Sequence, residues 1–405
     1  MIMQDNEKKP ALRFKGFTDP WEQRKLGDIT VELSEYATQE LGLPLLTSSR
    51  SGLMYQDEYR DSRTTKSTET LFSVVPVGTC TYRHMSDDDV FHMNINTLEK
   101  GLVSREYPVF EASKGNNLEF LVQHINSSEE FKAFCAEQKK GGTRTRLYYN
   151  TLCQFTVRVP ALKEQAQISQ CLKKLDTLIT LHQRKYEKLV NIKKSMLDKM
   201  FPKNGASVPE IRFKGFTDPW EQRKLSDIVE KVTEKNAGWQ YIETFTNSAE
   251  FGIISQRDFF DHDISKIGSL DGYYVVHNED FVYNPRISVT APVGPINRNK
   301  LGRTGVMSPL YTVFRPHDID TTYLEHFFKS EYWHSFMNFN GDSGARSDRF
   351  SIKDSVFFEM PIPTPDIEEQ KKIGEFLTLL DTLITLHQRE HIKPILEVKR
   401  VKRNE

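Results

Sequence analysis

Apolar residues recur at alternating steps of four and three between residues 161 and 200. Eight of the ten positions in this series, which starts at residue 168, are apolar. A period of seven residues is typical of the seam of a coiled coil. Pro160 precedes the segment and Phe201-Pro202 follows it, so the pattern predicts one helix of about 37 residues, roughly 55 Å long. A long helix with a narrow apolar seam needs a partner helix.

A second segment near the end of the chain repeats the seam. Four positions of the first series recur 205 residues later with the same residues: Ile168, Leu172, Leu175 and Ile179 return as Ile373, Leu377, Leu380 and Ile384. Asp366 with Glu369 three residues on forms a capping box at the start of this second helix. We expect strong pairing between 166–184 and 371–389, and loose pairing beyond.

The tail of the second segment departs from the first. Pro394 stands where the first copy has Leu189, and a proline inside a helix removes a hydrogen bond and collides with the previous turn. The sequence therefore predicts a kink or fraying near 390–394 and a shorter second helix.

Both helices belong to a longer repeat. The segment RFKGFTDPWEQRKL occupies 13–26 and again 212–225, and LDTLITLHQR occupies 175–184 and again 380–389. Between these matched frames, the inserts 30–158 and 229–360 hardly resemble each other. Strand-like runs and short helical patterns predict an α+β fold with a β-rich core for each insert. Similar frames around different inserts indicate one shared geometry and two different recognised targets.

Weak echoes between the inserts mark candidate contact residues. Gly142-Thr143-Arg144 answers Gly344-Ala345-Arg346, and a second arginine follows each loop. Glycines allow close approach of the backbone, and paired arginines suit phosphates or guanine edges. An ordinary hairpin turn with exposed arginines is the alternative. The candidate DNA-binding residues are Tyr82, Arg83, Arg144, Arg146, Tyr283, Asn284, Arg286, Arg346 and Arg349.

Composition narrows the setting of the protein. The 405 residues carry a net charge of −1, with a basic surplus in both long helices that solvated helix faces would also explain. All four cysteines lie in the first half, none at metal-ligand spacing, which favours a reducing compartment. No apolar run is long enough to span a membrane. We therefore expect a cytoplasmic protein.

Motifs for catalysis are fragmentary. His387 to His391 matches the H-x-x-E-H zinc pattern, but the first copy lacks the ligands and both histidines fall on the predicted seam. The capping box explains Asp366 and Glu369 better than a nuclease cluster does. Asn284-Pro285 lacks the aromatic residue that follows it in amino-methyltransferases. We expect a non-catalytic chain with no metal and no cofactor of its own.

The ordered set of motifs resembles the specificity subunit of type I restriction-modification systems. Its marks are Trp21 to Ile29 and its copy Trp220 to Ile228, the Gly-x-Arg loops, and Pro160-x-x-x-Glu164-Gln165 with its copy from Pro365. The resemblance implies two β-rich target-recognition domains joined by two long antiparallel coiled-coil helices, with a pseudo-twofold internal repeat. The implied segments are recognition domains at 1–160 and 205–363 and spacer helices at 161–204 and 364–405.

The resemblance also implies partners. Each recognition domain would read one half of a split target in double-stranded DNA, and the helices would set the gap. The helices would dock two methyltransferase subunits, and motor-nuclease restriction subunits would join, with AdoMet, ATP and Mg bound by those partners. Two other classes stay open: a two-headed protein scaffold without DNA, and a stand-alone methyltransferase or nuclease.

Overall fold

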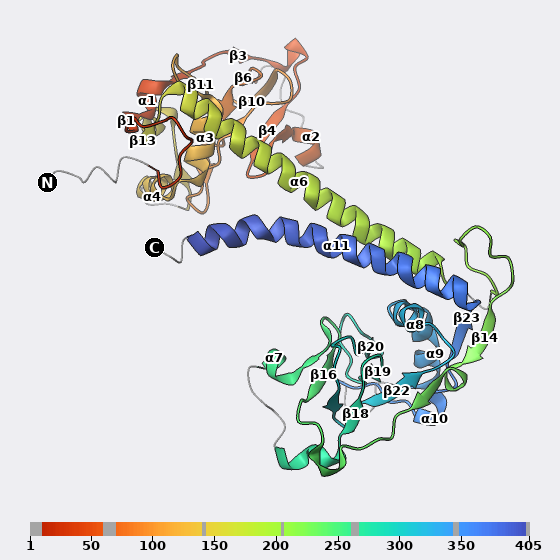
Figure 1. Ribbon diagram of the computed structural model, residues 1–405. Coiled ribbons are helices and arrows are strands. Elements are labelled where there is room, and N and C mark those ends of the chain that lie inside the picture. Colours follow the sequence, from red (N-terminus) through yellow and green to blue (C-terminus); the bar gives the residue numbers. More distant parts are fainter. Residues whose placement is uncertain are drawn as a thin grey trace. The chain divides into compact units, whose positions relative to one another are not determined.

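The computed structural model describes residues 10–59, 70–139, 143–203, 206–260, 267–342 and 348–401. Of residues 259, 260, 267–269 and 389–401 it describes the backbone alone. The contacts divide the chain into two compact units, Met1–Leu178 and Ile179–Glu405 (Figure 1). The division falls inside a long helix, and the four segments expected from the sequence stay a prediction.

The first unit is built on short antiparallel strands. Its sheets are ordered β2-β11-β7-β9 and β10-β6-β3, with the pairs β1-β13, β4-β5 and β8-β12. The strands are β1 (Glu22–Lys25), β2 (Thr30–Glu32), β3 (Tyr36–Ala37), β4 (Leu46–Ser49), β5 (Gly52–Tyr55), β6 (Phe72–Val75), β7 (Cys80–Thr81), β8 (Met85–Ser86), β9 (Asn94–Ile95), β10 (Gly101–Ser104), β11 (Val109–Ala112), β12 (Thr145–Arg146) and β13 (Thr156–Val159). The helices are α1 (Leu26–Ile29), η2 (Gln39–Leu41), α2 (Gln56–Tyr59), α3 (Leu118–Ser127), α4 (Glu129–Glu137) and α5 (Tyr149–Leu152).

Helix α3 closes the core of this unit. Its N-cap, Asn117, accepts a hydrogen bond from the backbone N–H of Phe120 at 2.8 Å, which satisfies one of the unpaired donors of the first turn. Phe120 and Leu121 are buried among the sheet residues of the core. The ring of Trp21, from the repeated frame, meets Phe120 edge-on. The frame therefore packs directly on the insert.

The second unit repeats this strand arrangement. Its four-stranded sheet is ordered β15-β22-β19-β20, and the pairs are β14-β23, β16-β17 and β18-β21. The strands are β14 (Glu221–Lys224), β15 (Val229–Lys231), β16 (Phe245–Ser248), β17 (Gly252–Ser255), β18 (Tyr274–Val276), β19 (Phe281–Tyr283), β20 (Ile296–Arg298), β21 (Gly305–Met307), β22 (Thr312–Pro316) and β23 (Pro361–Thr364). The helices are η3 (Leu225–Asp227), η4 (Ala237–Trp239), α7 (Gln256–Phe260), η5 (Ile267–Gly272), α8 (Thr321–Phe328), α9 (Tyr332–Asn340) and α10 (Asp354–Phe357).

Two long helices follow the inserts. Helix α6 (Leu162–Lys199) has 38 residues, close to the expected length. Helix α11 (Ile367–Val401) has 35 residues, so it is shorter than α6 as expected, but its backbone stays helical past Pro394, where a kink or fraying was expected. A proline removes one backbone hydrogen bond, and the neighbouring turns keep theirs, so the helix continues. None of the helices described in the chain is long and apolar enough to cross a membrane.

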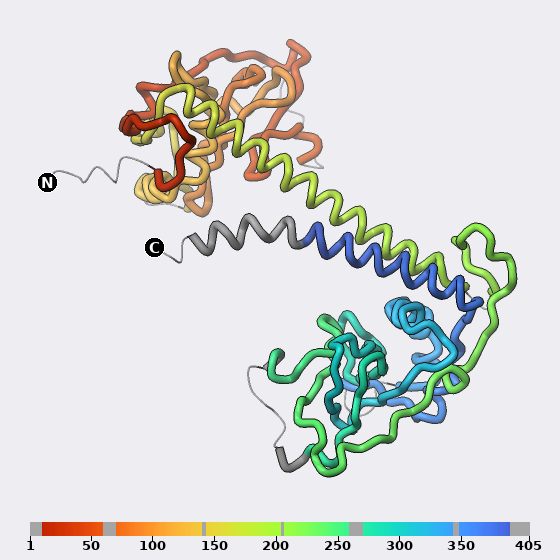
Figure 2. The backbone as a smooth tube through the Cα atoms, in the orientation of Figure 1, coloured from red at the N-terminus to blue at the C-terminus, as the bar shows by residue number. Residues whose placement is uncertain are grey.

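The last turns of α6 lie beside α11 in the second unit (Figure 2). His182 Nδ1 lies 3.4 Å from His387 Nδ1, and Lys193 forms an ion pair with Asp381. Higher numbers on α6 therefore meet lower numbers on α11, and the two segments run in opposite directions.

The packing corrects the expected register. Leu189, Ile192 and Met196 pack against the core cluster that contains Leu377 and Leu380. The partner of 371–387 is thus 182–200, whereas the sequence repeat suggested 166–184. Two copies of a repeat can pair residue for residue along their whole length only when the helices are parallel. Opposed helices bring equivalent residues together only at one point.

Candidate nucleic-acid interface and its helical frame

The repeated frame contains a buried ion pair in each unit. Arg13 donates from Nε and Nη2 to the carboxylate of Glu164 at 2.7 Å each, and Arg212 donates likewise to Glu369 at 2.8 Å each. The two glutamates are buried, with side-chain exposures of 1% and 0%. Such two-pronged, charge-assisted pairs fix both partners in direction as well as distance. Each pair fastens an RFKGFTDPW segment to the start of a long helix.

The glutamine that follows each glutamate joins the long helix to the insert. Gln165 Oε1 accepts from the backbone N–H of Asn117 at 2.8 Å, and its Nε2 donates to the carbonyl of Pro160 at 2.8 Å. Gln370 does the same with Asp320 at 2.9 Å and Pro365 at 2.8 Å. Asn117 and Asp320 are the N-caps of α3 and α8. The Glu-Gln motif occurs twice in the sequence, but its role depends on contacts between the repeated frame, the long helix and the insert, which are distant in the chain. We call the Arg, Glu and Gln of each unit the clasp.

The tryptophan beside each clasp is bonded in one unit and not in the other. Trp220 Nε1 donates to Glu369 Oε2 at 3.0 Å, while the buried Trp21 Nε1 has no hydrogen-bond partner. The second clasp therefore satisfies one more buried donor than the first.

Two variable loops meet in each unit. In the first unit, β8 pairs with β12, which sets Met85 opposite Arg146 and Ser86 opposite Thr145. In the second unit, an isolated bridge joins Arg286 and Arg349. We call residues 83–90 with 143–148 the first loop pair, and residues 284–291 with 348–351 the second loop pair. Candidate residues from distant parts of each insert thus lie together.

The predicted arginines of the loop pairs reach solvent to different extents. Arg83, Arg144 and Arg146 are exposed in the first loop pair, as is Arg286 in the second, where Arg349 is half-buried. Arg346, with Gly344 and Ala345, lies outside the described residues.

Asn284 shapes the turn of the second loop pair. Its Nδ2 donates to the carbonyl of Asn247 at 2.8 Å, and its Oδ1 accepts from the backbone N–H of Arg286 at 3.0 Å. Both ends of its amide are therefore occupied by backbone groups. This arrangement positions Arg286 at the surface.

The two predicted tyrosines lie in the protein core. Tyr82 is 0% exposed and donates from its hydroxyl to the carbonyl of Leu147 at 3.1 Å. Tyr283 is 3% exposed and donates to the carbonyl of Val293 at 2.9 Å. Burial raises the pKa of both phenols. A buried, satisfied tyrosine cannot contact DNA without opening the core, so we correct these two assignments to structural roles.

The predicted seam residues fall into two groups. Ile373, Leu377 and Leu380 are buried, and Ile384 is half-buried. In the first copy, Ile168 is half-buried, and the remaining three are exposed: Leu172, Leu175 and Ile179. The seam expected of both copies is therefore covered mainly in the second.

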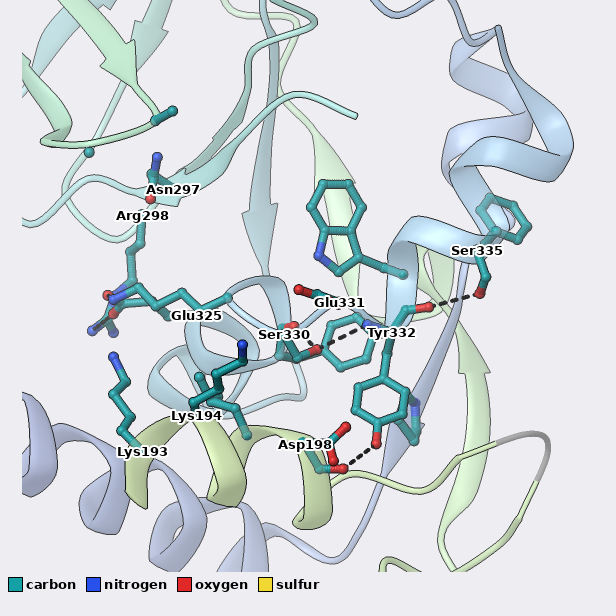
Figure 3. Close-up of a pocket in the computed structure, with 18 of the residues that line it drawn as sticks. Lys193, Lys194, Asp198, Asn297, Arg298, Glu325, Ser330, Glu331, Tyr332 and Ser335 are labelled. Carbon is teal, nitrogen blue, oxygen red and sulfur yellow. Dashed lines mark hydrogen bonds and ion pairs between the residues drawn. The ribbon is translucent and has the colours of Figure 1, made fainter. Parts of the chain in front are cut away.

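A cavity of about 1180 Å³ opens in the second unit between the last turns of α6, helices α8 and α9, and the β16–β17 turn (Figure 3). Lys193 and Lys194 line it from α6. The hydroxyl of Tyr332 donates to the carbonyl of Asp198 at 2.7 Å, which connects α9 to the end of α6. The cavity is thus lined by both the repeated helix α6 and the variable insert.

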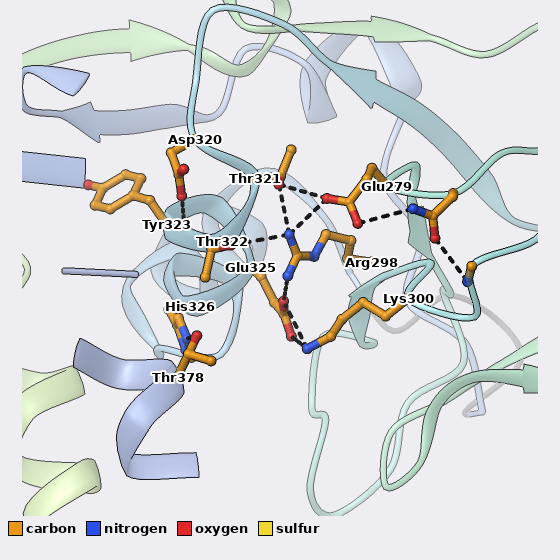
Figure 4. A network of polar contacts seen from close by, with 12 residues as sticks. Glu279, Arg298, Lys300, Asp320, Thr321, Thr322, Tyr323, Glu325, His326 and Thr378 are labelled. Carbon is orange, nitrogen blue, oxygen red and sulfur yellow. Dashed lines mark hydrogen bonds and ion pairs between the residues drawn. The ribbon is translucent and has the colours of Figure 1, made fainter. Parts of the chain in front are cut away.

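A polar network forms one wall of this cavity (Figure 4). The carboxylate of Glu325, on α8, bonds to Arg298 Nη2 at 2.6 Å, to Lys300 at 3.2 Å and to Lys329 at 2.8 Å. Burial raises the pKa of Glu325, but these three cations outweigh burial and lower the pKa to about 2. The carboxylate of Glu325 therefore stays ionised near neutral pH.

The zinc-like pattern gains no support from its described part. His387 is 8% exposed and lies beside His182, while the side chains of Glu390 and His391 lie outside the described residues. Within the described residues, no group of three or more His, Cys, Asp or Glu side chains could hold a metal ion.

A family model described as "Type I restriction modification DNA specificity domain" matches residues 92–191 and 217–396. The chain belongs to this family. This membership confirms the resemblance drawn from the frames, the loops and the long helices.

Two relatives extend the match. The chain is 25% identical over 273 residues to the type I restriction enzyme MjaVIII specificity subunit of Methanocaldococcus jannaschii, covering 64% of this chain and 63% of that protein. It is also 25% identical over 289 residues to the putative type I restriction enzyme MjaX specificity subunit of the same organism, covering 67% and 62%. The matches span less than two thirds of each relative.

The fold is similar to one solved structure of the family. The S subunit of a type I restriction-modification system from M. genitalium matches with a TM-score of 0.53 and 11% identity, over 97% of both chains. At this identity the likeness concerns the fold, which mixes helices and sheets in both proteins.

Proposed function

We propose that this chain is the DNA-recognition subunit of a type I restriction-modification complex and reads a bipartite target in double-stranded DNA. The observation that carries the proposal is the pairing of variable loops in each unit: the residues that follow each Gly-x-Arg motif, Thr145-Arg146 and Arg349, pair with the loop that follows the buried tyrosine. Family membership supplies the context. Each loop pair would contact one half-site.

The arrangement of the helices supports a pseudo-twofold repeat. His182 and His387 occupy the same place in the two copies of LDTLITLHQR, and they contact each other. In an antiparallel pair, equivalent residues meet only where the local axis passes. We propose that this axis runs between the two histidines, that α6 and α11 act as one spacer, and that the spacer length sets the gap between half-sites.

The frame is the part that both halves share, so it suits partners that come in equal copies. We propose that two methyltransferase subunits dock on the frame helices and that restriction subunits join them. AdoMet, ATP and Mg would be bound by those partners, and this chain would be non-catalytic and cytoplasmic. The residues proposed for docking and for the spacer are the eight seam residues: Ile168, Leu172, Leu175, Ile179, Ile373, Leu377, Leu380 and Ile384.

An exchange of one insert tests the proposal that each insert recognises one half-site. Methylated sites in the host genome are first mapped, and then residues 229–360 are replaced by the corresponding insert of another family member. We expect one half of the methylated sequence to change and the other half to stay. A change in both halves, or methylation at unrelated sites, would contradict one half-site per insert.

Single arginines test the loop pairs. Arg146→Ala and Arg349→Ala, in the complex with methyltransferase subunits, should each reduce the slope of log affinity against log salt by about one. Arg105→Ala is the matched control, because Arg105 lies over the ring of Tyr36 and outside the loop pair. Unchanged affinity and slope in both loop variants would reject the interface. A two-headed protein scaffold would retain no DNA at any salt concentration.

A further inference from the structure

The first loop pair contains a run of three aspartates, and each binds a different cation. Asp87 Oδ1 accepts from Arg144 Nε at 2.7 Å, the Asp88 carboxylate accepts from Arg50 Nη2 at 2.5 Å, and Asp89 Oδ2 lies 3.4 Å from Lys139 Nζ. Three cations from three separate segments are thereby drawn to one loop.

Two of these ion pairs lie at an open surface, whereas Asp89 is half-buried. The side chains of Asp87 and Arg144 are 68% and 53% exposed, and those of Asp88 and Arg50 are 51% and 64% exposed. Asp87, Asp88, Arg50 and Arg83 line a cavity of about 590 Å³ together with several serines. The cavity therefore presents donors and acceptors side by side.

The second loop pair is built without such a run. Between Arg286 and Ala291 the chain reads Ile, Ser, Val and Thr, and Val289 is fully exposed. The backbone bridge from Arg286 to Arg349 forms all the same. The aspartates are therefore not required to bring two loops of this kind together.

Carboxylates and DNA phosphates compete for the same cations. Exposed ion pairs contribute little to stability, so a duplex can displace them. The released aspartates would then face the phosphates unless they find hydrogen-bond donors. Exposed amino groups of cytosine or adenine in the major groove are such donors, and Asp is a known acceptor for the cytosine N4 amino group.

We propose that Asp87, Asp88 and Asp89 are specificity-determining residues of the first half. They hold Arg50, Lys139 and Arg144 away from phosphates, and they release these cations when base amino groups of the half-site replace them as partners. The inference rests on the proposed DNA-recognition function. It adds that the first half rejects unrelated DNA through charge, by a device that the second loop pair does not repeat in its described residues.

The test compares two duplexes, one with the mapped target and one with the first half-site scrambled. Their affinities for the assembled complex with methyltransferase subunits are measured over a range of KCl concentrations. For the triple variant Asp87→Asn, Asp88→Asn and Asp89→Asn, we expect about 10- to 100-fold tighter binding of the scrambled duplex. The salt slope should steepen by up to about three units, because three cations become available. The ratio of target to scrambled affinity should fall.

Glu35→Gln is the matched control, because Glu35 pairs with the exposed Lys100 at 2.9 Å in the same unit but outside the loop pair. An equal gain for this control would reduce the effect to net charge and overturn the inference. The inference would also be overturned if the triple variant kept the wild-type ratio of target to scrambled affinity and the wild-type salt slope, while the wild type still prefers its target. Wild-type complex that binds neither duplex would instead contradict the proposed function. A thermal melt of each variant confirms that it is folded.

Discussion

The two copies of LDTLITLHQR have identical residues and different surroundings. Leu380 is 6% exposed, and its counterpart Leu175 is 47% exposed; Leu377 is 0% exposed, and its counterpart Leu172 is 41% exposed. The second copy is covered by the end of α6, where Leu189, Ile192 and Met196 supply apolar side chains. One sequence thus serves as a buried core in one place and a surface in another.

The difference follows from what each copy can be paired with. The counterparts of Leu189 and Ile192, 205 residues on, are Pro394 and Glu397. The repeat therefore does not supply a second copy of the apolar residues that cover the seam of α11. A repeated seam predicts an apolar face, but the residues opposite decide whether that face is buried.

The helices beside the two copies differ as well. Helix α8 begins at its N-cap Asp320 as α3 begins at Asn117, so Glu325 corresponds to Val122 and His326 to Gln123. Likewise Arg298 corresponds to Ile95, because the flanking asparagines bond to equivalent backbone carbonyls. Where the first half has the apolar residues Ile95 and Val122, the second has the buried ion pair of Arg298 and Glu325. Substitutions that break a contact of the second half, or replace it with the residues of the first half, should show which contacts stabilise the second half.

The largest effect is expected at the buried ion pair. Glu325→Val leaves Arg298, whose side chain is 9% exposed, without its closest carboxylate and should lower the free energy of unfolding by about 4 kcal/mol. The double variant Arg298→Ile, Glu325→Val recreates the pair of the first half and should recover at least half of that loss. Urea unfolding of both variants measures the difference. If the single and the double variant lost equal free energy of unfolding, an unpaired Arg298 would not be the cause of the loss in the single variant.

The next effect concerns the seam. Leu377→Ala removes a fully buried side chain and should lower the free energy of unfolding by about 3 kcal/mol. Leu172→Ala, at the matching place in the first copy, should cost less than about 1 kcal/mol in the isolated chain, because much of that side chain already contacts water. Similar losses at the two positions would show that the first seam is covered as well as the second.

A smaller effect depends on pH. Burial, the largest cause, and the nearby Lys329 lower the pKa of His326 to about 4, against the opposing effects of Asp381 and Glu325. The folded state thus holds His326 neutral, so its contribution is present above about pH 6.5 and is lost as pH falls toward 4. Between pH 7 and pH 5 the loss should be about 2 kcal/mol. His326→Gln, the residue of the first half, should remove that part of the pH dependence and leave the contributions of the other histidines. An unchanged profile would contradict this account.

Much of the frame could be predicted from the sequence. The bounds of α6 and the buried seam at Leu377 and Leu380 follow from periodicity, because a helix seam is a local pattern. Helix α11 continues past Pro394 because one proline does not outweigh the remaining turns. The exposure of Leu172 was not predictable, because periodicity identifies an apolar face and not what covers it.

The candidate interface was predictable in part. The echoes between the inserts located two loops that the structure brings together in each unit, but they also marked Tyr82 and Tyr283, which are buried. The two tyrosines recur because the shared core requires them, so recurrence alone does not identify a contact residue. The aspartates at 87–89 recur nowhere and gave no signal, although they bind the cations at the surface.

The clasp has a consequence for how such chains can change. Gln165 and Gln370 hold the inserts through the backbone N–H groups of Asn117 and Asp320, which any amino acid except proline would offer. The joint between frame and insert therefore places almost no demand on the insert's own sequence. A recombination event that replaces an entire insert between two frame segments would meet a ready-made attachment, and new recognition could be acquired in a single genetic step instead of residue by residue.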